Sequence, residues 1–437
     1  MFNSILAPVR LFIATPSHSL QGGVERIMES LAAHLPARGI EVVLGLGKGA
    51  RFNDPARFRE AFPAIPAVDI DGSSGTAFGR RRALRRAIER ADPDVVLVAR
   101  MFDAYPVASA LKRDGHRLRL AVTVQAYEAD YFADLARWAD FVDLVVTSGE
   151  LVADAARRFT GVPAERIVSI PGGVAPARRA RRPNDGPLRL GYVGRLEQTQ
   201  KRVLDLPLLV AELERRGIPF TLDVAGDGSL AAELQARLPE ARFHGWRSTD
   251  ELYDRVYPEL DVFVHFAEWE GITIAPREAM AHGAVPVVSR FTGLAAERQF
   301  LDGVNALTFP VGDLGAAADA IERLHRDRAL LARLSGTAKS SQDGIRSEEG
   351  AADAWAAAFR DAVTREPRLG KVFPALPRDP GLLTSLGVPD AVAEVLRRVR
   401  KRPHGDPGSE WPHWSGLADP QLARDLEAFA RISSEPS

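Results

Sequence analysis

The sequence predicts an α/β protein built from two doubly wound domains. Short runs rich in β-branched residues alternate with longer segments of helical periodicity, and this alternation occurs twice. A stretch rich in Pro, Gly and Arg at residues 171–187 separates the two series. Such alternation implies parallel sheets covered by crossover helices on both faces. A chain of 437 residues is long enough for two or three domains with sizeable cores.

The first series forms the expected N-terminal domain, residues 1–185. It opens with a strand at 9–15, a glycine-bearing loop at 17–23 and a helix at 24–38. Gly39 stands just past the last apolar position of that helix, as is common at helix ends. Further strands are expected at 42–46, 95–99, 120–124 and 144–147.

The second series forms the expected C-terminal domain, residues 186–349. Its strands are predicted at 188–193, 220–225, 262–266 and 285–289, and its helices at 203–216, 230–238 and 276–282. Residues 350–365 are expected to form a helix that returns toward the N-terminal domain. Residues 366–437 form an extension in which Pro is frequent, with short helices at 390–400 and 420–432.

The composition excludes several classes of protein. The chain has no Cys, which removes disulfide scaffolds, thiolate metal sites and cysteine nucleophiles. No apolar run reaches the roughly 18–20 residues that span a bilayer, and no secretory signal pattern opens the chain. We therefore expect a cytoplasmic protein. Walker A, G-x-G-x-x-G, H-E-x-x-H and G-x-S-x-G motifs are absent at the positions where they would carry function.

The net charge of −1 conceals two unlike halves. Residues 1–185 carry 26 basic and 21 acidic side chains, and the remainder carries 31 and 37. The basic half contains an arginine run on an expected helix: Arg80, Arg81, Arg82, Arg85, Arg86 and Arg90. A solvated helix face is the preferred interpretation of this run. Contact with an anionic membrane surface or an acidic acceptor stays open as the alternative.

Candidate ligand-binding residues fall at strand-to-helix junctions of both series. Gly22 and Gly23 precede the first helix, where glycine allows close backbone approach and free N–H groups attract an anion. Arg195 and Lys201 follow a strand and Gly194, and their charges suit a diphosphate. Taken alone, the glycine pair is a weak signal that a plain tight turn also explains. For the two cations alone, a solvated surface pair is the preferred interpretation.

Glu270 and Glu278 form a third candidate group. They are eight residues apart in EWEGITIAPREAM, with Gly271 between them and Pro276 suited to the first turn of a helix. A loop of this kind can wrap backbone N–H groups around phosphate, and a Glu can accept hydrogen bonds from vicinal hydroxyls. Taken alone, each Glu is better explained as a helix cap or a surface partner. All three groups are expected to face one cleft.

An ordered set of motifs resembles a known family. The motifs are GGVERIMESLAAHL, GYVGRLEQTQK, DVAGDGSLAAEL, FHGWRSTDEL, DVFVHFAEWEG, EAMAHGAVPVVS and DGVNALTFPVGD. Together they are similar to glycosyltransferase family four, the retaining GT-B group with a Glu-x7-Glu motif, which Glu270 and Glu278 match. The resemblance covers residues 9–365 and leaves the extension outside it.

The resemblance implies a retaining transfer from a nucleotide-diphosphate sugar, with UDP or GDP as the favoured nucleotide. It implies no obligatory metal or cofactor. It also implies that the leaving phosphate itself deprotonates the acceptor, so that no protein nucleophile is required. Arg195 and Lys201 would hold the diphosphate and neutralise its developing charge. Glu278 would bind the ribose, and Glu270 would orient the sugar. The remaining donor contacts implied are Gly22, Gly23, Gly194, Gly271, Ile272, Thr273 and Ile274.

Two positions depart from the family pattern. Many relatives have a His where this chain has Gln125, which cannot titrate but can hydrogen-bond a sugar hydroxyl. Arg202 stands where Gly is usual, and its larger side chain is expected to narrow the donor pocket. The candidate acceptor contacts are His18, Gln125 and Glu128. The implied acceptor is a carbohydrate, a lipid-linked precursor or a small molecule; no nucleic-acid partner is expected, and the chain would be a monomer or homodimer.

Other functions remain compatible with these residues. A non-catalytic subunit that binds nucleotide sugars and supports a partner enzyme is the main alternative, kept open by Gln125. A phosphorylase or epimerase of the same fold is a further alternative, although no lysine here is marked as a pyridoxal anchor.

Overall fold

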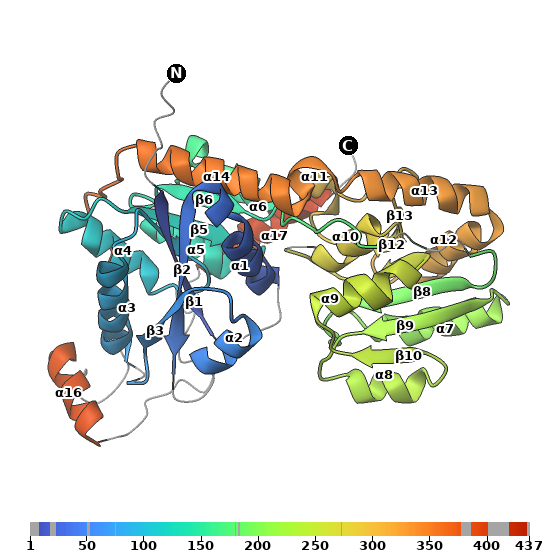
Figure 1. Cartoon of the computed structure of the whole chain (residues 1–437), viewed down its shortest axis with the longest axis horizontal. Helices are drawn as coiled ribbons and strands as arrows, with labels where there is room; N and C mark the ends of the chain where they lie inside the picture. The colour runs from blue at the N-terminus through green and yellow to red at the C-terminus, as the bar shows by residue number, and fades with distance from the viewer. Residues whose placement is uncertain are drawn as a thin grey trace. The chain divides into compact units, whose positions relative to one another are not determined.

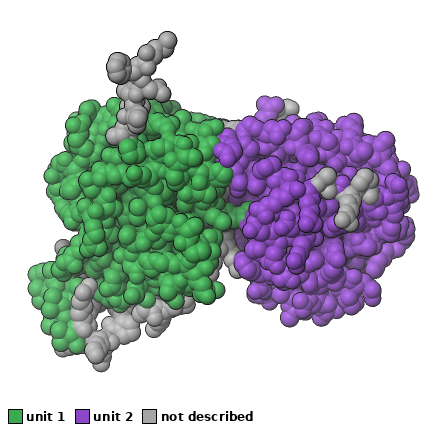
Figure 2. Space-filling view, viewed as in Figure 1, with its two compact units in different colours: residues 1–148, 152–170, 352–426 green, residues 149–151, 171–351, 427–437 purple. Residues whose placement is uncertain are grey.

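The computed structural model describes residues 8–17, 23–49, 53–74, 76–179, 181, 184–271, 273–376, 386–400 and 419–434. The chain divides into two compact units (Figure 2). Unit 1 consists of residues 1–148, 152–170 and 352–426, and unit 2 of residues 149–151, 171–351 and 427–437. Each unit contains its own parallel sheet covered by helices (Figure 1). The predicted fold class, two Rossmann-like α/β domains, is confirmed.

Unit 1 is built on a seven-stranded parallel sheet of order β3-β2-β1-β4-β5-β6-β7. The strands are β1 Val9–Pro16, β2 Ile40–Lys48, β3 Ala67–Asp71, β4 Val95–Val98, β5 Arg119–Val124, β6 Leu144–Thr147 and β7 Ile167–Ser169. The central strands are buried along their length because helices cover both faces. The strand order reverses between β1 and β4, so ligands are expected at the carboxyl ends of these strands.

The helices that surround this sheet begin with α1 Gly23–His34, α2 Pro55–Ala61, α3 Ala77–Ala91, α4 Ala104–Arg113, α5 Ala129–Trp138 and α6 Glu150–Phe159. Two more come from later in the chain: α14 Glu348–Thr364 and α16 Asp390–Arg400. The last helix, α17 Pro420–Ser434, is divided between unit 1, up to Leu426, and unit 2, from Glu427. The side chain of Thr76 accepts a hydrogen bond from Gly79 N and caps α3. The basic residues Lys112 and Arg113 lie in the last turn of α4, where they complement the helix dipole.

The first part of the C-terminal extension packs onto unit 1. Arg119 donates to the carbonyl oxygens of Ala362 and Arg365 and so closes the end of α14. Phe373 packs edge-on against Trp138, with ring centroids 5.1 Å apart. Gly370 lies against Phe141 so closely that a Cβ atom there would overlap the ring. Residues up to about 376 are therefore a structural part of unit 1.

Unit 2 is built on a six-stranded parallel sheet of order β10-β9-β8-β11-β12-β13. The strands are β8 Leu188–Val193, β9 Phe220–Ala225, β10 Arg242–Gly245, β11 Val262–His265, β12 Val285–Ser289 and β13 Leu307–Phe309. The order reverses between β8 and β11, and the carboxyl ends of these two strands carry the loops of interest.

The helices of unit 2 are α7 Asp205–Arg215, α8 Ala231–Arg237, α9 Thr249–Glu251, α10 Ile274–Ala281, α11 Leu294–Glu297, α12 Leu314–Arg326 and α13 Arg328–Ser340. A π-helical turn at Leu252–Val256 and a 3-10 turn at Tyr257–Glu259 follow α9. One apolar core joins β8, β9, β11 and β12 to α7, α12 and α13, with Leu190, Val264 and Ile321 among its buried members. This core fixes the strand ends from which the candidate site projects.

Candidate active site

The centre of the candidate site is a buried ion pair between two loops of unit 2. Lys201 lies in the loop after β8, and Glu270 lies in the loop after β11. Lys201 Nζ is 2.6 Å from Glu270 Oε1, within hydrogen-bond distance. The Glu270 side chain is only 4% exposed and that of Lys201 16%. The pair therefore stands at the reversal point of the sheet, with the lysine on the more open side.

Glu270 is held in its ionised form. Burial by itself would raise the pKa of this carboxyl, but the charge of Lys201 and the nearby His265 outweigh burial and lower the pKa to about 2. A carboxylate with so low a pKa cannot serve as a general acid or base near neutral pH. The Glu270 carboxylate can instead accept hydrogen bonds and supply a fixed negative charge.

His265 is a site residue whose contact the sequence interpretation missed. It is the last residue of β11, and its Nε2 lies 2.9 Å from Glu270 Oε1. The residue is buried, and that burial lowers its pKa. Its position was a usable signal, because it ends a strand five residues before Glu270.

Gln200 links the ion pair to a second cation. Its Nε2 donates to the carbonyl oxygen of Trp269 at 3.1 Å. Its Oε1 accepts from Nη2 of Arg195 at 2.5 Å. The Arg195 side chain is 60% exposed, so its guanidinium faces solvent beside the carboxyl end of β8. Arg195 and Lys201 are thus brought to the same edge, as their spacing predicts.

Glycine allows the loops at this edge to approach one another. Gly226 follows β9 with a φ of 138°, and a Cβ atom there would overlap the carbonyl oxygen of Gly194. Gly194 N donates to Ala225 O at 3.0 Å, and Gly226 N donates to Gly245 O at 2.8 Å. Gly194 therefore lies where the backbone segments after β8 and β9 pack closely together, beside Arg195.

Glu278 occupies a different environment from Glu270. It lies in the second turn of α10 and is buried, and its Oε2 accepts a hydrogen bond from the Tyr257 hydroxyl at 2.7 Å. The Glu278 carbonyl oxygen lies 2.8 Å from Nδ1 of His282, whose ring meets Tyr253 edge-on. The carboxylate is therefore oriented by the Tyr257 hydroxyl, whereas that of Glu270 is oriented by Lys201 and His265.

The segment between the two glutamates leads into α10. Gly271 and Thr273 flank Ile272, which lies outside the described residues. The Thr273 hydroxyl donates to Gln299 at 2.8 Å and is buried. Ile274 is the first residue of α10, so the backbone N–H groups near it belong to a helix N-terminus.

Arg202 stands where the family pattern has glycine, and its backbone conformation and contacts bear on that difference. Its φ is +49°, a left-handed conformation that favours glycine. Its guanidinium bonds to Asp205 at 2.9 Å and to Glu268 at 3.1 Å. The side chain is thus tied to two acidic neighbours. These contacts do not support the prediction that it narrows the donor pocket.

The candidate acceptor residues lie in unit 1. Gln125 follows β5, is buried and donates from Nε2 to the Thr123 hydroxyl, while its Oε1 has no hydrogen-bond partner within the described part of the chain. Glu128 occupies the N-cap position of α5. Of the two glycines predicted as donor contacts, Gly23 is the first residue of α1. His18 and Gly22 lie outside the described residues.

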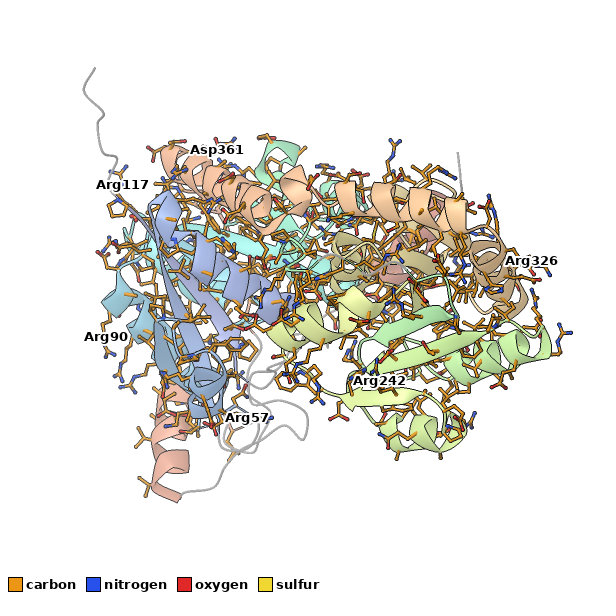
Figure 3. All side chains as sticks on the ribbon, turned by 45° about the vertical axis from the view of Figure 1, so that its right-hand side comes forward. Arg57, Arg90, Arg117, Arg242, Arg326 and Asp361 are labelled. Atoms are coloured by element: carbon orange, nitrogen blue, oxygen red, sulfur yellow. The ribbon has the colours of Figure 1, made fainter. Side chains whose placement is uncertain are left out.

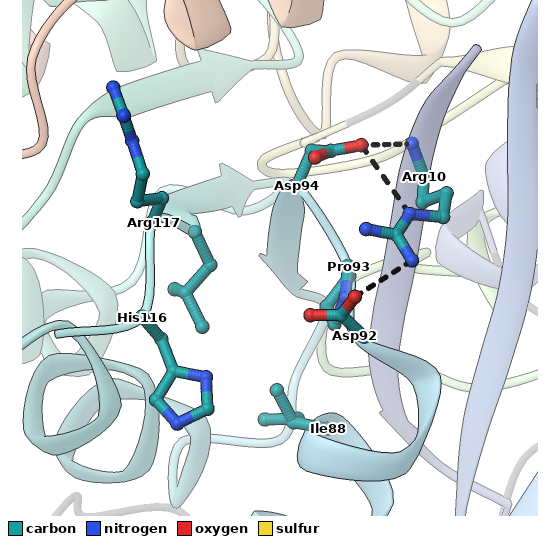
Figure 4. A pocket seen from close by; sticks show the side chains of 8 residues that line it. Arg10, Ile88, Asp92, Pro93, Asp94, His116 and Arg117 are labelled. Carbon is teal, nitrogen blue, oxygen red and sulfur yellow. Dashed lines mark hydrogen bonds and ion pairs between the residues drawn. The ribbon is translucent and has the colours of Figure 1, made fainter. Parts of the chain in front are cut away.

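A small cavity in unit 1 is separate from these residues. It has a volume of about 120 Å³ and lies at the amino ends of β1 and β4, the edge opposite Gln125 (Figure 4). Arg10 pairs there with Asp92 at 2.9 Å, and its backbone N–H donates to Asp94 at 2.8 Å. The charge of Arg10 is therefore balanced by these aspartates.

Of the described helices, none has the length and apolar character that crossing a membrane requires.

Comparison with protein families identifies two matching domains. Residues 21–178 match the family described as "Glycosyltransferase Family 4", and residues 187–327 match "Glycosyl transferases group 1". The second match contains the whole Lys201–Glu270 site. Neither match reaches the extension.

Individual relatives agree with these families. A GDP-mannose-dependent alpha-mannosyltransferase of Mycobacterium tuberculosis is 29% identical over 374 residues, covering 76% of this chain and 93% of that protein. A glycogen synthase of the same organism is 30% identical, covering 54% of this chain and 59% of the relative. Among solved structures, HepE of Anabaena in complex with UDP has a TM-score of 0.66 at 16% identity, covering 81% of this chain and all of that one.

Proposed function

We propose that this chain, a GT-B glycosyltransferase of family four, transfers a sugar from a nucleotide-diphosphate sugar to an acceptor hydroxyl with retention at the anomeric carbon. The observation that carries the proposal is the buried Lys201–Glu270 pair at the reversal point of the unit 2 sheet. We assign donor binding to residues 186–349 and acceptor binding to residues 1–185.

The donor diphosphate would bind at the two cations. Lys201 donates one of its three N–H groups to Glu270, so further N–H groups remain to bind phosphate oxygens. Arg195 offers an exposed planar guanidinium that suits bidentate contact with phosphate. Both charges would stabilise the nucleoside diphosphate as it departs, a role that is worth most where water is excluded.

Glu270 would orient the sugar and offset positive charge at its anomeric carbon. A pKa of about 2 keeps it anionic throughout the reaction. The bond from the anomeric carbon to the phosphate oxygen breaks, and the bond to the acceptor oxygen forms on the same face. The acceptor proton passes to the departing phosphate oxygen, so no protein base or nucleophile is required.

Glu278 would hold the ribose hydroxyls. The Tyr257 hydroxyl and the surrounding aromatic residues fix its carboxylate, which favours discrimination of one ligand geometry. Gln125 would orient the acceptor through its amide, since its buried Oε1 is a hydrogen-bond acceptor that lacks a partner in the described chain.

The relatives favour two donor nucleotides. Among them are proteins named for GDP-mannose and structures that contain UDP, so UDP- and GDP-sugars are the donors to test first. Purified protein should release UDP or GDP from one of these sugars when acceptor is present, and proton NMR of the product should show the donor's anomeric configuration. Inversion of configuration would refute the retaining reaction.

The alternative is a non-catalytic subunit that binds nucleotide sugars. Gln125 favours it, because the family resemblance implies a histidine at that position and an amide cannot titrate. A thermal-shift screen separates the two, since donor binding stabilises either protein but only the enzyme turns donor over. Binding without turnover, across UDP- and GDP-sugars and a panel of acceptors, would favour the subunit.

A further inference from the structure

Gln125, to which the proposed function assigns orientation of the acceptor, is closed off from solvent. The residue is only 5% exposed, although it follows β5 at the carboxyl edge of the unit 1 sheet. Its Oε1 is buried and has no hydrogen-bond partner within the described part of the chain. An acceptor hydroxyl therefore reaches this amide only if a neighbouring element moves away.

Helix α17 is anchored beside Gln125. Tyr127 lies two residues further on, in the segment that joins β5 to α5. Two residues apart in sequence, the Cα atoms of Gln125 and Tyr127 are no more than about 8 Å from each other. The Tyr127 hydroxyl donates to the carbonyl oxygen of Leu426, in α17, at 2.8 Å. All three residues belong to unit 1, so this contact lies within one unit.

The side of α17 that carries Leu426 is packed against the protein. Leu426 is only 3% exposed, whereas its neighbours Asp425 and Glu427 are exposed. Charged side chains of other helices likewise face solvent, as Asp361 of α14 does, which is 54% exposed and projects outward (Figure 3). Helix α17 is therefore docked through an apolar position and presents its charged positions to water.

Tyr127 is itself held in place for this contact. Its ring packs edge-on against Phe132 of α5, with ring centroids 5.4 Å apart. Burial raises the pKa of the Tyr127 hydroxyl, which keeps the hydroxyl protonated and able to donate. A neutral hydrogen bond and a buried leucine contribute modestly to stability, so this contact can open without unfolding unit 1.

We propose that α17 is a cover of the acceptor subsite, held closed by Tyr127, and that it moves away from residues 125–128 when the acceptor enters. The proposal rests on the proposed function, which places the acceptor at Gln125. Tyr127 is then a positioning residue that acts through Leu426. Both family matches end before residue 328, so the cover lies outside the matched domains.

A cover at this position has a chemical purpose. Water is a competing acceptor for the sugar, and a closed acceptor subsite keeps it from the anomeric carbon until the acceptor arrives. Opening the cover in the absence of acceptor would let water attack the donor, which yields free sugar and nucleoside diphosphate.

The rate of thiol labelling tests whether α17 covers Gln125. The chain has no Cys, so the cysteine of Gln125→Cys is its only thiol and should react slowly with a maleimide. Adding Leu426→Asp should raise the labelling rate by about tenfold or more, because a charge is unfavourable at this buried position. Adding Tyr127→Phe instead should raise it about fivefold, since one hydrogen bond is lost while the ring remains.

Two controls separate local opening from unfolding. Arg424→Asp introduces the same side chain at an exposed position of α17 and should leave the labelling of Gln125→Cys unchanged. Val145→Cys, in the buried strand β6, should label slowly with or without Leu426→Asp. If Leu426→Asp also exposes the thiol of Val145→Cys, the comparison with Tyr127→Phe decides. Equal labelling of Gln125→Cys with and without the change in α17 would overturn the proposal.

Donor hydrolysis tests the link between the cover and the reaction. Without acceptor, Leu426→Asp should release UDP or GDP from the donor several-fold faster than the wild type, because water enters the subsite. Unchanged hydrolysis despite faster labelling would overturn the assignment of α17 to the acceptor subsite. If neither protein turns over any donor, the proposed function fails, whereas the labelling rates still decide whether α17 covers Gln125.

Discussion

Lys201 and Glu270 neutralise each other at the carboxyl edge of the unit 2 sheet, with Lys201 Nζ 2.6 Å from Glu270 Oε1. Each residue therefore has two tasks. The lysine compensates a buried carboxylate and also offers N–H donors for a phosphate, while the carboxylate holds the lysine in place and presents a negative charge. The predictions for this pair must separate its contribution to folding from its contribution to donor binding.

Lys201→Met should impair both stability and donor use. Leaving Glu270 buried without its cation should cost on the order of 3 kcal/mol of unfolding free energy, measured with chemical denaturant. Under the proposed function, donor kcat/KM should fall by about a hundredfold or more, because the charge that would stabilise the leaving diphosphate is lost.

The double variant Lys201→Met with Glu270→Gln separates these effects. Removing both charges should recover most of the stability, since neither partner is left as an isolated buried ion. Catalytic activity should stay low. Recovery of activity together with stability would show that Lys201 acts only as a structural partner of Glu270.

The low pKa of Glu270 predicts a defined loss of stability in acid. Its pKa of about 2 in the folded chain lies below the unfolded value of about 4.3, so the ionised form stabilises the fold above about pH 5. That contribution, on the order of 3 kcal/mol, is lost as the pH falls through about 4 toward 2. The stability advantage of wild type over Glu270→Gln should therefore shrink between pH 6 and pH 3. An advantage that stays constant over this range would contradict the assignment.

Asp134 should show the opposite pH dependence. Burial in α5, reinforced by the charge of Asp130, raises its pKa to about 7, and its Oδ2 lacks a partner among the described residues. A raised pKa means that ionisation costs stability as the pH rises from about 4 to 7. Asp134→Asn should therefore be more stable than wild type at pH 8, by up to about 4 kcal/mol, and closest to it at pH 4. Denaturant titrations at the two pH values measure this difference.

The sequence predicts the fold class well because both sheets have central strands that are buried on two faces. Strand β4 (VVLV), for example, therefore appears as an uninterrupted apolar run. The four edge strands, β3, β7, β10 and β13, were not predicted. Strands β3 (AVDID) and β10 (RFHG) contain polar residues, and β7 and β13 are only three residues long. Tertiary pairing, which local patterns do not encode, determines these strands.

The site could be predicted only in part for a related reason. Strand ends are visible in the sequence, so Arg195, Lys201 and Glu270 could be placed at one edge. The partners that orient them are distant in sequence or lack a motif. Gln200 joins Arg195 to the Trp269 carbonyl, and Tyr257 reaches Glu278 from a 3-10 turn 21 residues away. Such contacts depend on loop conformation rather than on periodicity.

Arg202 offers a direct test of backbone strain at the site. Both Arg202→Ala and Arg202→Gly remove the ion pairs with Asp205 and Glu268. Only glycine adopts a φ of +49° without steric cost, so Arg202→Gly should be about 1 kcal/mol more stable than Arg202→Ala. Both variants should retain sugar transfer, because this side chain is engaged with its two acidic neighbours. Equal melting temperatures for the two variants would argue against the left-handed conformation.

Gly370 tests whether the start of the extension belongs to the fold of unit 1. An alanine Cβ there would overlap the buried ring of Phe141, which is packed between Trp138 and Phe373 and has little room to move. Gly370→Ala should therefore destabilise unit 1 by about 1–3 kcal/mol, and Phe373→Ala should also lower its stability. Gly336→Ala is the matched control, because a Cβ there meets no other atom within contact distance and the residue lies in α13 of unit 2. If Gly370→Ala melts like wild type, residues 366–376 make no structural contribution and the extension begins immediately after α14.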